Sequence, residues 1–333
     1  MNRKNRRATE KAQGNNKAKS TPVAVPDNTL AESLRAQGMN LKATGKDAEA
    51  IPFLTKALQH DPTFADVHFT LAMMAQTKPA LNISMEDINA TITDKATLGR
   101  SYQSILTIMK KRRQYKEALV CQTELCRLHP TDYDEKANLA LLYNMIGQKD
   151  NALRLLAELM IEAPDKKVYK SLFATTCGSV SYNQHEPSVK RALQICFDNI
   201  YEANLYKAYA TWAVVVLRDP ACSGLAEAVM NTSSEEVFVK WIENTSSAQR
   251  AFLQERFFLD GLRLLTVASP IFETCLTHMR RWLCLNAHRL AQKNELSFFE
   301  PFLMALGEQC FYNEYIYTTS TDESSIINEL LDT

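Results

Sequence analysis

Apolar positions in the first half of the chain follow a helical spacing that repeats at a fixed interval. Before each of three prolines, Pro62, Pro130 and Pro164, apolar residues recur at i, i+3, i+4 and i+7 over two successive stretches. This spacing predicts two helices in each unit, and the proline ends the second helix because it cannot continue a hydrogen-bonded turn. Pro62 lies twice as far from Pro130 as Pro130 lies from Pro164, which fits one repeating interval of about 34 residues. The pattern therefore predicts a tandem array of helical pairs.

Small residues occupy recurring places in these units. They allow the two antiparallel helices of a unit to approach closely, while large apolar residues fill the space to the next unit. Helical pairs repeated at this interval are the pattern of tetratricopeptide repeats, or TPRs. We therefore expect an all-α protein in which a TPR helical-hairpin solenoid over residues 30–180 precedes a non-repeat helical domain over residues 185–331. The small residues concerned are Gly38, Ala50, Ala57, Ala118, Ala140 and Ala152.

The unit between the first two prolines, residues 65–98, keeps the phase of the array but departs from its pattern. Its first helix has suitable apolar residues, whereas Pro79 and the largely β-branched stretch 88–93 weaken its second helix. The pattern leaves two interpretations open: a degraded repeat, or a helix followed by a longer loop. A fifth first helix is predicted from Lys167 to Ala174.

Beyond residue 185 the sequence is helical without a period. We expect helices at 187–202, 204–218, 222–230, 234–243, 246–265, 270–290, 294–311 and 321–331. Residues 1–28 are polar and interrupted by Pro22 and Pro26, and the first twenty carry seven Lys or Arg against Glu10 alone. Such a segment cannot bury enough apolar surface to fold by itself, so we expect a disordered basic arm.

Composition narrows the classes of function. The 333 residues carry 38 Lys or Arg and 38 Asp or Glu, so no overall field favours nucleic acid or a cationic partner. The eight cysteines include no CxxC pair and mostly lie in apolar helical stretches, as reduced thiols do in a reducing compartment. The N-terminus lacks the apolar region of a secretory signal, and the longest apolar run, Ala208–Leu217, is too short to span a bilayer. We expect a cytoplasmic protein without a membrane partner.

No residue pattern predicts chemistry. The six histidines are scattered without HxxxH or HExxH spacing, so no metal site is expected. The nine glycines include no G-x-G turn of the kind that holds a nucleotide or cofactor, so no cofactor is expected. Cys310 lies on an apolar stripe with Leu303 and Leu306, which indicates core packing rather than a nucleophile. We therefore predict no catalytic residue and no enzyme activity.

Solenoid repeats bind their ligands on an extended concave surface, which in a TPR array is lined by the first helix of each unit. The exposed first-helix positions of the three regular units form a mixed, mildly basic surface that suits an acidic or amphipathic peptide. The Lys and Asn set that would clamp a C-terminal carboxylate is absent. Each single residue has a competing interpretation as an ordinary solvated side chain. The candidate protein-binding residues are Arg35, Lys42, Gln103, Lys110, Lys111 and Asn144.

Two C-terminal blocks are more specific than a helical core requires. The first, residues 273–283, reads E-x-x-L-T-x-x-R-R-x-L, and the second, residues 305–315, reads A-L-x-x-Q-C-F-x-N-E-Y. Placed behind TPR units, these blocks resemble bacterial TPR-containing proteins whose C-terminal part is a class I methyltransferase that uses S-adenosylmethionine. The opening residues, M-N-R-K-N-R-R-A, also resemble the start of alphaproteobacterial TPR proteins. The resemblance implies a link to a methyltransferase, as a partner or as a neighbouring domain.

The chain differs from that family at the residues that bind S-adenosylmethionine. The S-adenosylmethionine site of the family requires a G-x-G turn, and this chain has none and ends shortly after the second block. The chain therefore resembles the repeat and helical regions of the family without its catalytic domain. No catalytic residue is carried over.

These observations leave three functional hypotheses. The leading one is a TPR adaptor or scaffold that mediates protein–protein interaction, with substrate recognition for a methyltransferase as its more specific form. A rival makes the helical domain part of an S-adenosylmethionine-dependent methyltransferase, with Glu273, Arg280, Gln309 and Glu314 as a polar cluster. The third hypothesis is that the basic arm binds RNA or the ribosome, although nucleic acid is not the partner that we expect.

Overall fold

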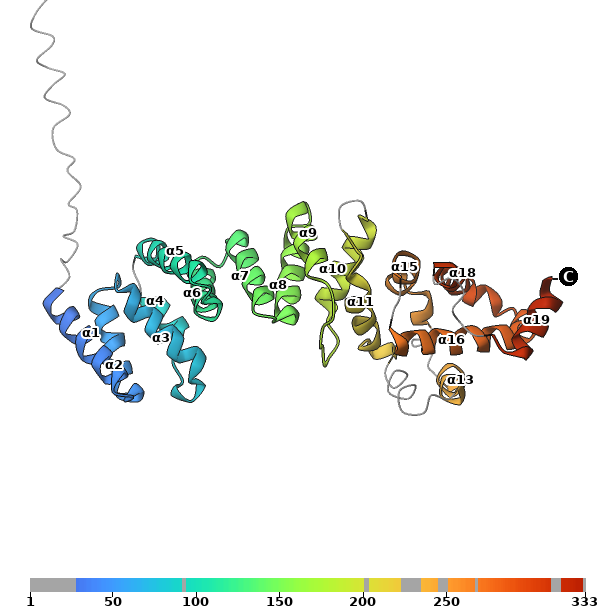
Figure 1. Ribbon diagram of the computed structural model, residues 1–333, viewed down its shortest axis with the longest axis horizontal. Helices are drawn as coiled ribbons and strands as arrows, with labels where there is room; N and C mark the ends of the chain where they lie inside the picture. The colour runs from blue at the N-terminus through green and yellow to red at the C-terminus, as the bar shows by residue number, and fades with distance from the viewer. Residues whose placement is uncertain are drawn as a thin grey trace, which may run out of the picture. The chain divides into compact units, whose positions relative to one another are not determined.

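The part of the chain that the structure describes is helical throughout and contains no strand, which confirms the prediction of an all-α fold (Figure 1). The contacts divide the chain into two compact units, one up to Tyr102 and one from Gln103 onward, and each is described by itself. The computed structural model describes residues 28–91, 94–200, 204–222, 235–244, 251–266, 269–312 and 319–331.

The helices of the first unit are short to medium in length, and the last of them, α5, crosses into the second unit. They are α1 (Asn28–Ala43), α2 (Asp47–His60), α3 (Ala65–Thr77), the 3-10 helix η1 (Pro79–Leu81), α4 (Met85–Thr91) and α5 (Lys95–Lys111). The second unit contains α6 (Tyr115–Leu128), α7 (Tyr133–Met145), α8 (Lys149–Glu162), α9 (Lys167–Thr176), α10 (Pro187–Asp198), α11 (Ala208–Leu217), η2 (Pro220–Cys222), α13 (Glu235–Asn244), η3 (Phe252–Gln254), α15 (Arg256–Leu264), α16 (Pro270–Leu285), α17 (Ala287–Gln292), α18 (Leu296–Tyr312) and α19 (Thr321–Leu331).

The second helices of the regular units end in register. Helices α2, α6 and α8 end at His60, Leu128 and Glu162, each two residues before the proline of its unit. Within the units, α1 packs against α2 and α7 packs against α8. The repeating interval of the sequence is therefore also an interval of the structure, and the predicted helical hairpins are confirmed.

The turn inside each regular unit contains one residue with a left-handed backbone. Gly45, Arg113 and Gly147 have φ angles of 79°, 59° and 83°. In each case the next residue donates its N–H to a carbonyl five positions back, as Lys46 does to Leu41 at 2.9 Å, which closes the end of the first helix. Glycine adopts this conformation without steric cost, whereas an arginine is strained in it.

Fully buried small residues allow the helices of a hairpin to approach each other. Ala50, Ala118 and Ala152 occupy the same place in the three regular units, and all are fully buried. At Gly38 of α1, a Cβ atom would lie 2.6 Å from Cδ2 of Leu54 on α2, so no larger residue fits without a shift. The role predicted for small residues is confirmed at these positions.

The irregular second unit is a helix with a longer connection. Pro79 stands one repeat interval after Gly45, and its ring holds φ at negative values, so a left-handed turn cannot form there. The chain instead forms η1 and adopts a positive φ of 50° at Asn82. The second helix, α4, is then only seven residues long. Of the two interpretations left open by the sequence, this arrangement matches a helix followed by a longer connection, although Ile92 and Thr93 lie outside the described residues.

A buried polar group joins three helices of the first unit. On α3, His68 Nδ1 lies 2.6 Å from the Tyr102 hydroxyl and Nε2 lies 2.6 Å from Oδ1 of Asn89. An amide oxygen can only accept, so Nε2 carries the proton and Nδ1 accepts from the tyrosine. His68 therefore has the structural role that its isolated position in the sequence suggested.

The core of the second unit extends from the repeats into the non-repeat helices. Helix α8 packs against both α9 and α10, and one cluster of buried residues includes members from Ala137 to Leu306. Helix α9 begins at Lys167, where a fifth first helix was predicted. The predicted boundary between residues 180 and 185 falls within this cluster, and a separation of domain roles there stays a prediction.

Lys190 of α10 ties three of the non-repeat segments together. Its Nζ lies 2.9 Å from Oδ2 of Asp219 and also pairs with Glu255, beside the ring of Phe257. Burial by itself lowers the pKa of Lys190, but the two carboxylates outweigh burial and raise the pKa above its ordinary value. The charge is therefore retained inside the fold, where it holds the start of α15 near the end of α11.

Most helices predicted beyond residue 185 are present, with shifted ends. The predicted helix 246–265 is interrupted, because Glu255 is extended (φ −68°, ψ 128°) between η3 and α15. The predicted helix 270–290 is divided into α16 and α17. Most of the predicted helix 222–230 and of the predicted arm 1–28 lies outside the described residues.

We expect Gly261→Ala to destabilise the second unit strongly. An added Cβ would lie 2.1 Å from the indole of Trp212, a fully buried side chain whose Nε1 donates to the Phe257 carbonyl. Overpacking of this kind costs about 1–3 kcal/mol. The measurement is the midpoint of urea unfolding followed by tryptophan fluorescence. Gly307→Ala is the matched control, since its Cβ meets nothing within 4 Å. Equal urea midpoints for both variants would show that Gly261 is not required for close packing against Trp212.

A second pair of variants tests the left-handed turn position. Gly147→Ala forces a side chain into φ 83° and is expected to cost about 1 kcal/mol of stability. Arg113→Gly relieves the same strain and should be neutral or stabilising by up to about 0.5 kcal/mol, because glycine also gains entropy in the unfolded chain. Urea midpoints shifting in the same direction for both variants would show that these positions are not equivalent.

Candidate protein-binding face

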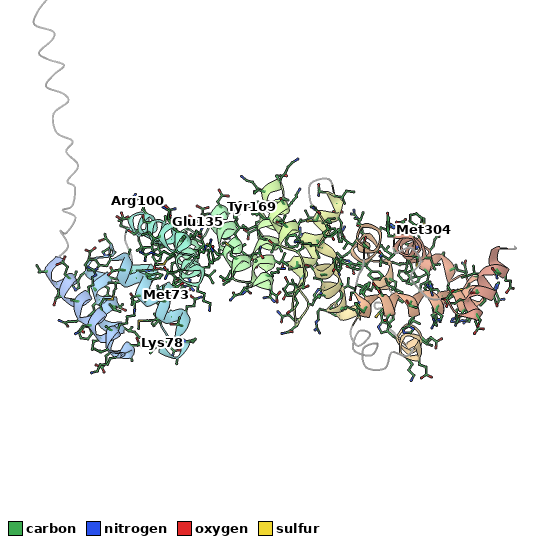
Figure 2. The ribbon with its side chains drawn as sticks, viewed as in Figure 1. Met73, Lys78, Arg100, Glu135, Tyr169 and Met304 are labelled. Carbon is green, nitrogen blue, oxygen red and sulfur yellow. The ribbon has the colours of Figure 1, made fainter. Side chains whose placement is uncertain are left out.

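Polar contacts one repeat apart join the first helices of successive units. Gln103 of α5 donates to Glu135 of α7 at 3.3 Å, and the Tyr169 hydroxyl of α9 donates to Asp134 of α7 at 3.2 Å. Figure 2 shows Glu135 and Tyr169 on these neighbouring helices. The second-unit part of α5, α7 and α9 therefore follow one another as a row of first helices.

Glu135 also accepts hydrogen bonds from Gln122, a residue that the repeat pattern did not predict as a contact. Gln122 of α6 is fully buried and donates Nε2 to both the carboxylate and the backbone carbonyl of Glu135. The equivalent positions of the other regular units are Leu54 and Leu156, so a glutamine at an apolar place was the signal that could have revealed it. The glutamine stabilises the α6–α7 junction instead of filling the hairpin core.

The row of first helices leaves one face uncovered, which we call the first-helix face. Three of its aliphatic side chains are exposed: Leu141 (37%), Met145 (55%) and Val168 (54%). Leu141 and Met145 lie toward the end of α7, and Val168 lies in the first turn of α9. Exposed apolar side chains on one face are a feature of interaction surfaces. The first-helix face comprises Ser104, Thr107 and Lys111 of α5, Asn138, Leu141 and Met145 of α7, and Val168, Leu172 and Thr175 of α9.

The turn between α5 and α6 bears a dense group of cations, which we call the basic turn. All five are exposed, and in the described part of the chain none has an ion-pair partner. Lys110 and Lys111 lie in the last turn of α5, where the helix dipole favours a positive charge. The dipole does not account for the other three. The basic turn comprises Lys110, Lys111, Arg112, Arg113 and Lys116.

The structure places the six predicted residues in different surroundings. Arg35 and Lys42 belong to the first unit. Arg35 is engaged by Asp66 at 2.7 Å and lies over the ring of Phe64, whereas Lys42 is exposed. Gln103 is engaged by Glu135.

Three predicted residues remain. Lys110 and Asn144 occupy the same position of successive repeats, and Lys111 directly follows Lys110. Lys110 and Asn144 contribute equivalent backbone carbonyls to their left-handed turns. The side chains of Lys110 and Lys111 are exposed and that of Asn144 is half-buried. Within the second unit, the structure thus brings together Lys110 and Lys111, and their role in binding stays a prediction.

A polar pocket of about 540 Å³ lies between the start of α8 and the connection from α9 to α10. Its charged groups are largely engaged within the protein. Arg154 donates to Glu186 at 2.6 Å and lies over the ring of Tyr182, while Asp150 accepts from the backbone N–H of Ser181. These contacts fasten the connection to the repeat and engage both Arg154 and Asp150 within the protein.

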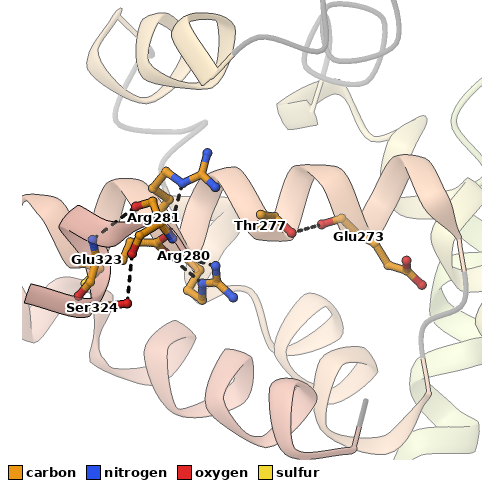
Figure 3. Close-up of polar contacts among 8 residues, drawn as sticks. Glu273, Thr277, Arg280, Arg281, Glu323 and Ser324 are labelled. Atoms are coloured by element: carbon orange, nitrogen blue, oxygen red, sulfur yellow. Dashed lines mark hydrogen bonds and ion pairs between the residues drawn. The ribbon is translucent and has the colours of Figure 1, made fainter. Parts of the chain in front are cut away.

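In the first of the two C-terminal blocks, the paired arginines hold the last helix. Arg280 Nε and Nη2 donate to Glu323 Oε1 at 3.2 and 3.1 Å, and Arg281 Nε donates to Oε2 at 3.2 Å (Figure 3). Glu323 also forms a capping box with Ser320: the Ser320 N–H donates to Oε2 at 2.8 Å, and the Glu323 N–H donates to Oγ. We call this group the α16–α19 clamp. The Ser-x-x-Glu spacing was readable from the sequence, and its arginine partners were not.

The clamp keeps a buried carboxylate charged. Glu323 is 1% exposed, and burial by itself would raise its pKa. The Ser320 N–H, Arg281 and Arg280 outweigh burial and hold the pKa of Glu323 below its usual range. The clamp therefore provides stability at neutral pH and loses it when the carboxylate is protonated.

Two members of the polar cluster in the rival enzyme hypothesis, Glu273 and Arg280, are not paired with each other in the described residues. Arg280 faces Glu323, while the carboxylate of Glu273 points away and Thr277 donates to the Glu273 carbonyl (Figure 3). Gln309 is buried on α18, and Glu314 lies outside the described residues. Geometry thus separates Glu273 from the arginine with which it was grouped.

The surroundings of all eight thiols favour the protonated form. Burial raises the pKa of all eight cysteines, for example to about 12 at Cys177 and Cys196, so they are protonated at neutral pH. At Cys310, burial raises the pKa although Arg280 opposes it. The core-packing role predicted for Cys310 agrees with this environment.

Among the described residues, no three His, Cys, Asp or Glu side chains converge as metal ligands would. Nor does any helix described here combine the length and apolar character needed to cross a bilayer. Comparison with protein-family models finds no match, and comparison with curated proteins finds none either. The resemblance to TPR proteins that carry a methyltransferase therefore stays a prediction.

We expect Glu323→Gln to loosen α19. The folded-state pKa is lowered, so the clamp contributes fully above the unfolded glutamate pKa of about 4.3 and loses its contribution as pH falls through the folded value. Because Arg280 and Arg281 lose their anionic partner, the substitution should lower the free energy of unfolding by about 1–3 kcal/mol at pH 7. Amide hydrogen exchange of residues 321–331 reports this loss, and urea midpoints at pH 7 and pH 3 report its pH dependence.

Glu329→Gln is the matched control, since that carboxylate is exposed and lies 3.6 Å from His288. It should leave exchange of α19 unchanged at pH 7. The difference between wild type and Glu323→Gln should shrink at pH 3, and a difference that stayed constant between the two pH values would refute the charge assignment.

Proposed function

We propose that this protein is a TPR-type adaptor that binds a segment of another protein on its first-helix face. The observation that carries the proposal is the row of exposed aliphatic side chains, Leu141, Met145 and Val168, on successive first helices. Burying such side chains against a ligand provides the main favourable term in association.

The repeated hairpins support the assignment to the TPR class. Their turns and buried alanines recur at equivalent positions, and the polar contacts of Gln103 and Tyr169 set the spacing of α5, α7 and α9. A preformed row of helices binds an extended or helical peptide without a large ordering cost in the receptor. Arg154 and Asp150 of the pocket beside α8 are engaged within the protein, and the lining of that pocket contains no aliphatic side chain, so the face is the better candidate for binding an apolar segment.

The test is selection of peptides from a displayed random library on the full chain. We expect enriched peptides whose affinity falls about tenfold or more in Leu141→Asp/Met145→Asp, because each aspartate places a charge in the apolar contact. Met304→Asp/Phe311→Asp is the matched control, since both side chains are exposed on α18 and lie outside the face; Figure 2 labels Met304.

The comparison is made by fluorescence anisotropy on folded variants, with helix content checked by circular dichroism. Peptides that bind wild type and the Leu141→Asp/Met145→Asp variant equally would place binding elsewhere. A library that yields no binder would remove the proposal.

A further inference from the structure

We propose that the ligand of the first-helix face is an acidic and apolar peptide segment, whose carboxylates bind the basic turn while its apolar side chains cover Leu141 and Met145. This inference rests on the proposed function and names the chemistry of its partner. It concerns residues 103–176, which lie within one compact unit.

The basic turn is retained against its local structural cost. Arg113 occupies the left-handed position that is glycine at the equivalent residues Gly45 and Gly147. Lys116 lies in the first turn of α6, where the helix dipole opposes a positive charge, and its equivalent after α7 is Asp150. Neither residue is what the fold alone favours, so a requirement other than folding explains their charge.

The charges of the basic turn remain available to a ligand. Some other cations of the same unit are engaged: Arg154 pairs with Glu186, and Lys136 lies 3.7 Å from Glu162. In contrast, no carboxylate of the described chain pairs with any of the five side chains of the basic turn. Five uncompensated charges within seven residues form a local positive field that attracts an anionic partner.

The repeat places this field beside the apolar part of the face. Lys110 and Lys111 are equivalent, one repeat earlier, to Asn144 and Met145. The contact from Gln103 to Glu135 joins α5 to α7 about two turns before these ends. Because both first helices run in the same direction, the cationic end of α5 and the apolar end of α7 are neighbours on one surface.

A peptide fits this surface better than a nucleic acid does. A phosphate backbone offers no apolar groups to cover Leu141, Met145 and Val168. Single-stranded nucleic acids are also held by exposed aromatic platforms, whereas Tyr115 beside the basic turn is only half-exposed. Carboxylates and aliphatic side chains on one short segment satisfy both halves of the surface.

The experiment uses labelled twelve-residue peptides and the full chain in fluorescence anisotropy. The first probe combines Asp, Glu, Leu and Phe; the second replaces the acids by Asn and Gln; the third replaces Leu and Phe by Ser. We expect the first to bind, with affinity falling as salt rises, and the other two to bind at least about tenfold more weakly.

Charge reversal then locates the site. Lys110→Glu/Lys111→Glu should weaken the first probe at least about tenfold, and the milder Arg112→Gln/Lys116→Gln should weaken it several-fold with folding preserved. Lys240→Glu/Lys293→Glu is the matched control: it changes net charge equally at two exposed lysines on α13 and after α17. We expect its affinity to remain within about twofold of wild type.

Several results would overturn the inference. Equal binding of the first two probes, or unchanged binding by both variants of the basic turn, would show that acidity is not recognised. Tighter binding of a twenty-nucleotide oligouridine that displaces the peptide would assign the basic turn to RNA. Library peptides that need Leu141 and Met145 but carry no acidic residue would leave the proposed function standing and remove only this inference.

Discussion

The repeat part of this protein depends on one constraint: two antiparallel helices must turn back over a very short connection and then pack at close distance. The left-handed residue at positions 45, 113 and 147 makes the turn possible, and the fully buried alanines at 50, 118 and 152 make the close packing possible. Where proline takes the place of the left-handed residue, at Pro79, the hairpin is replaced by a longer connection and a short α4. A single backbone angle thus separates a regular unit from an irregular one.

Once the hairpins are set, polar contacts at about one repeat of separation decide which residues remain accessible. Arg35 with Asp66 in the first unit, and Gln103 with Glu135 in the second, are side chains that would otherwise face solvent. The aliphatic residues of the first-helix face and the cations of the basic turn have no such internal partner. The proposed binding surface is therefore built from side chains that the scaffold does not use.

The non-repeat helices extend the same core, and two charged residues join some of these helices to one another. Lys190 and Glu323 are both held charged by partners on other helices, against the desolvation that burial imposes. Such groups add little net stability compared with apolar packing, but removing one partner leaves an uncompensated charge. The positions of η3, α15 and α19 therefore depend on these specific pairs as well as on hydrophobic contact, since Phe252, Phe257 and Phe258 are buried in the core.

The sequence by itself determined the helices of the repeats, their ends and their turns, because proline, glycine and alanine act through local backbone geometry and close packing. It also predicted α19 and the burial of most cysteines, five of which are buried while Cys126, Cys284 and Cys310 are partly exposed. Only the tertiary structure decided that Arg35 and Gln103 are engaged, that Gln122 is buried as a polar residue, and that Arg280 faces Glu323 rather than Glu273. These outcomes depend on which side chains meet across 13 to 43 residues of sequence, and spacing along one helix contains no information about such encounters.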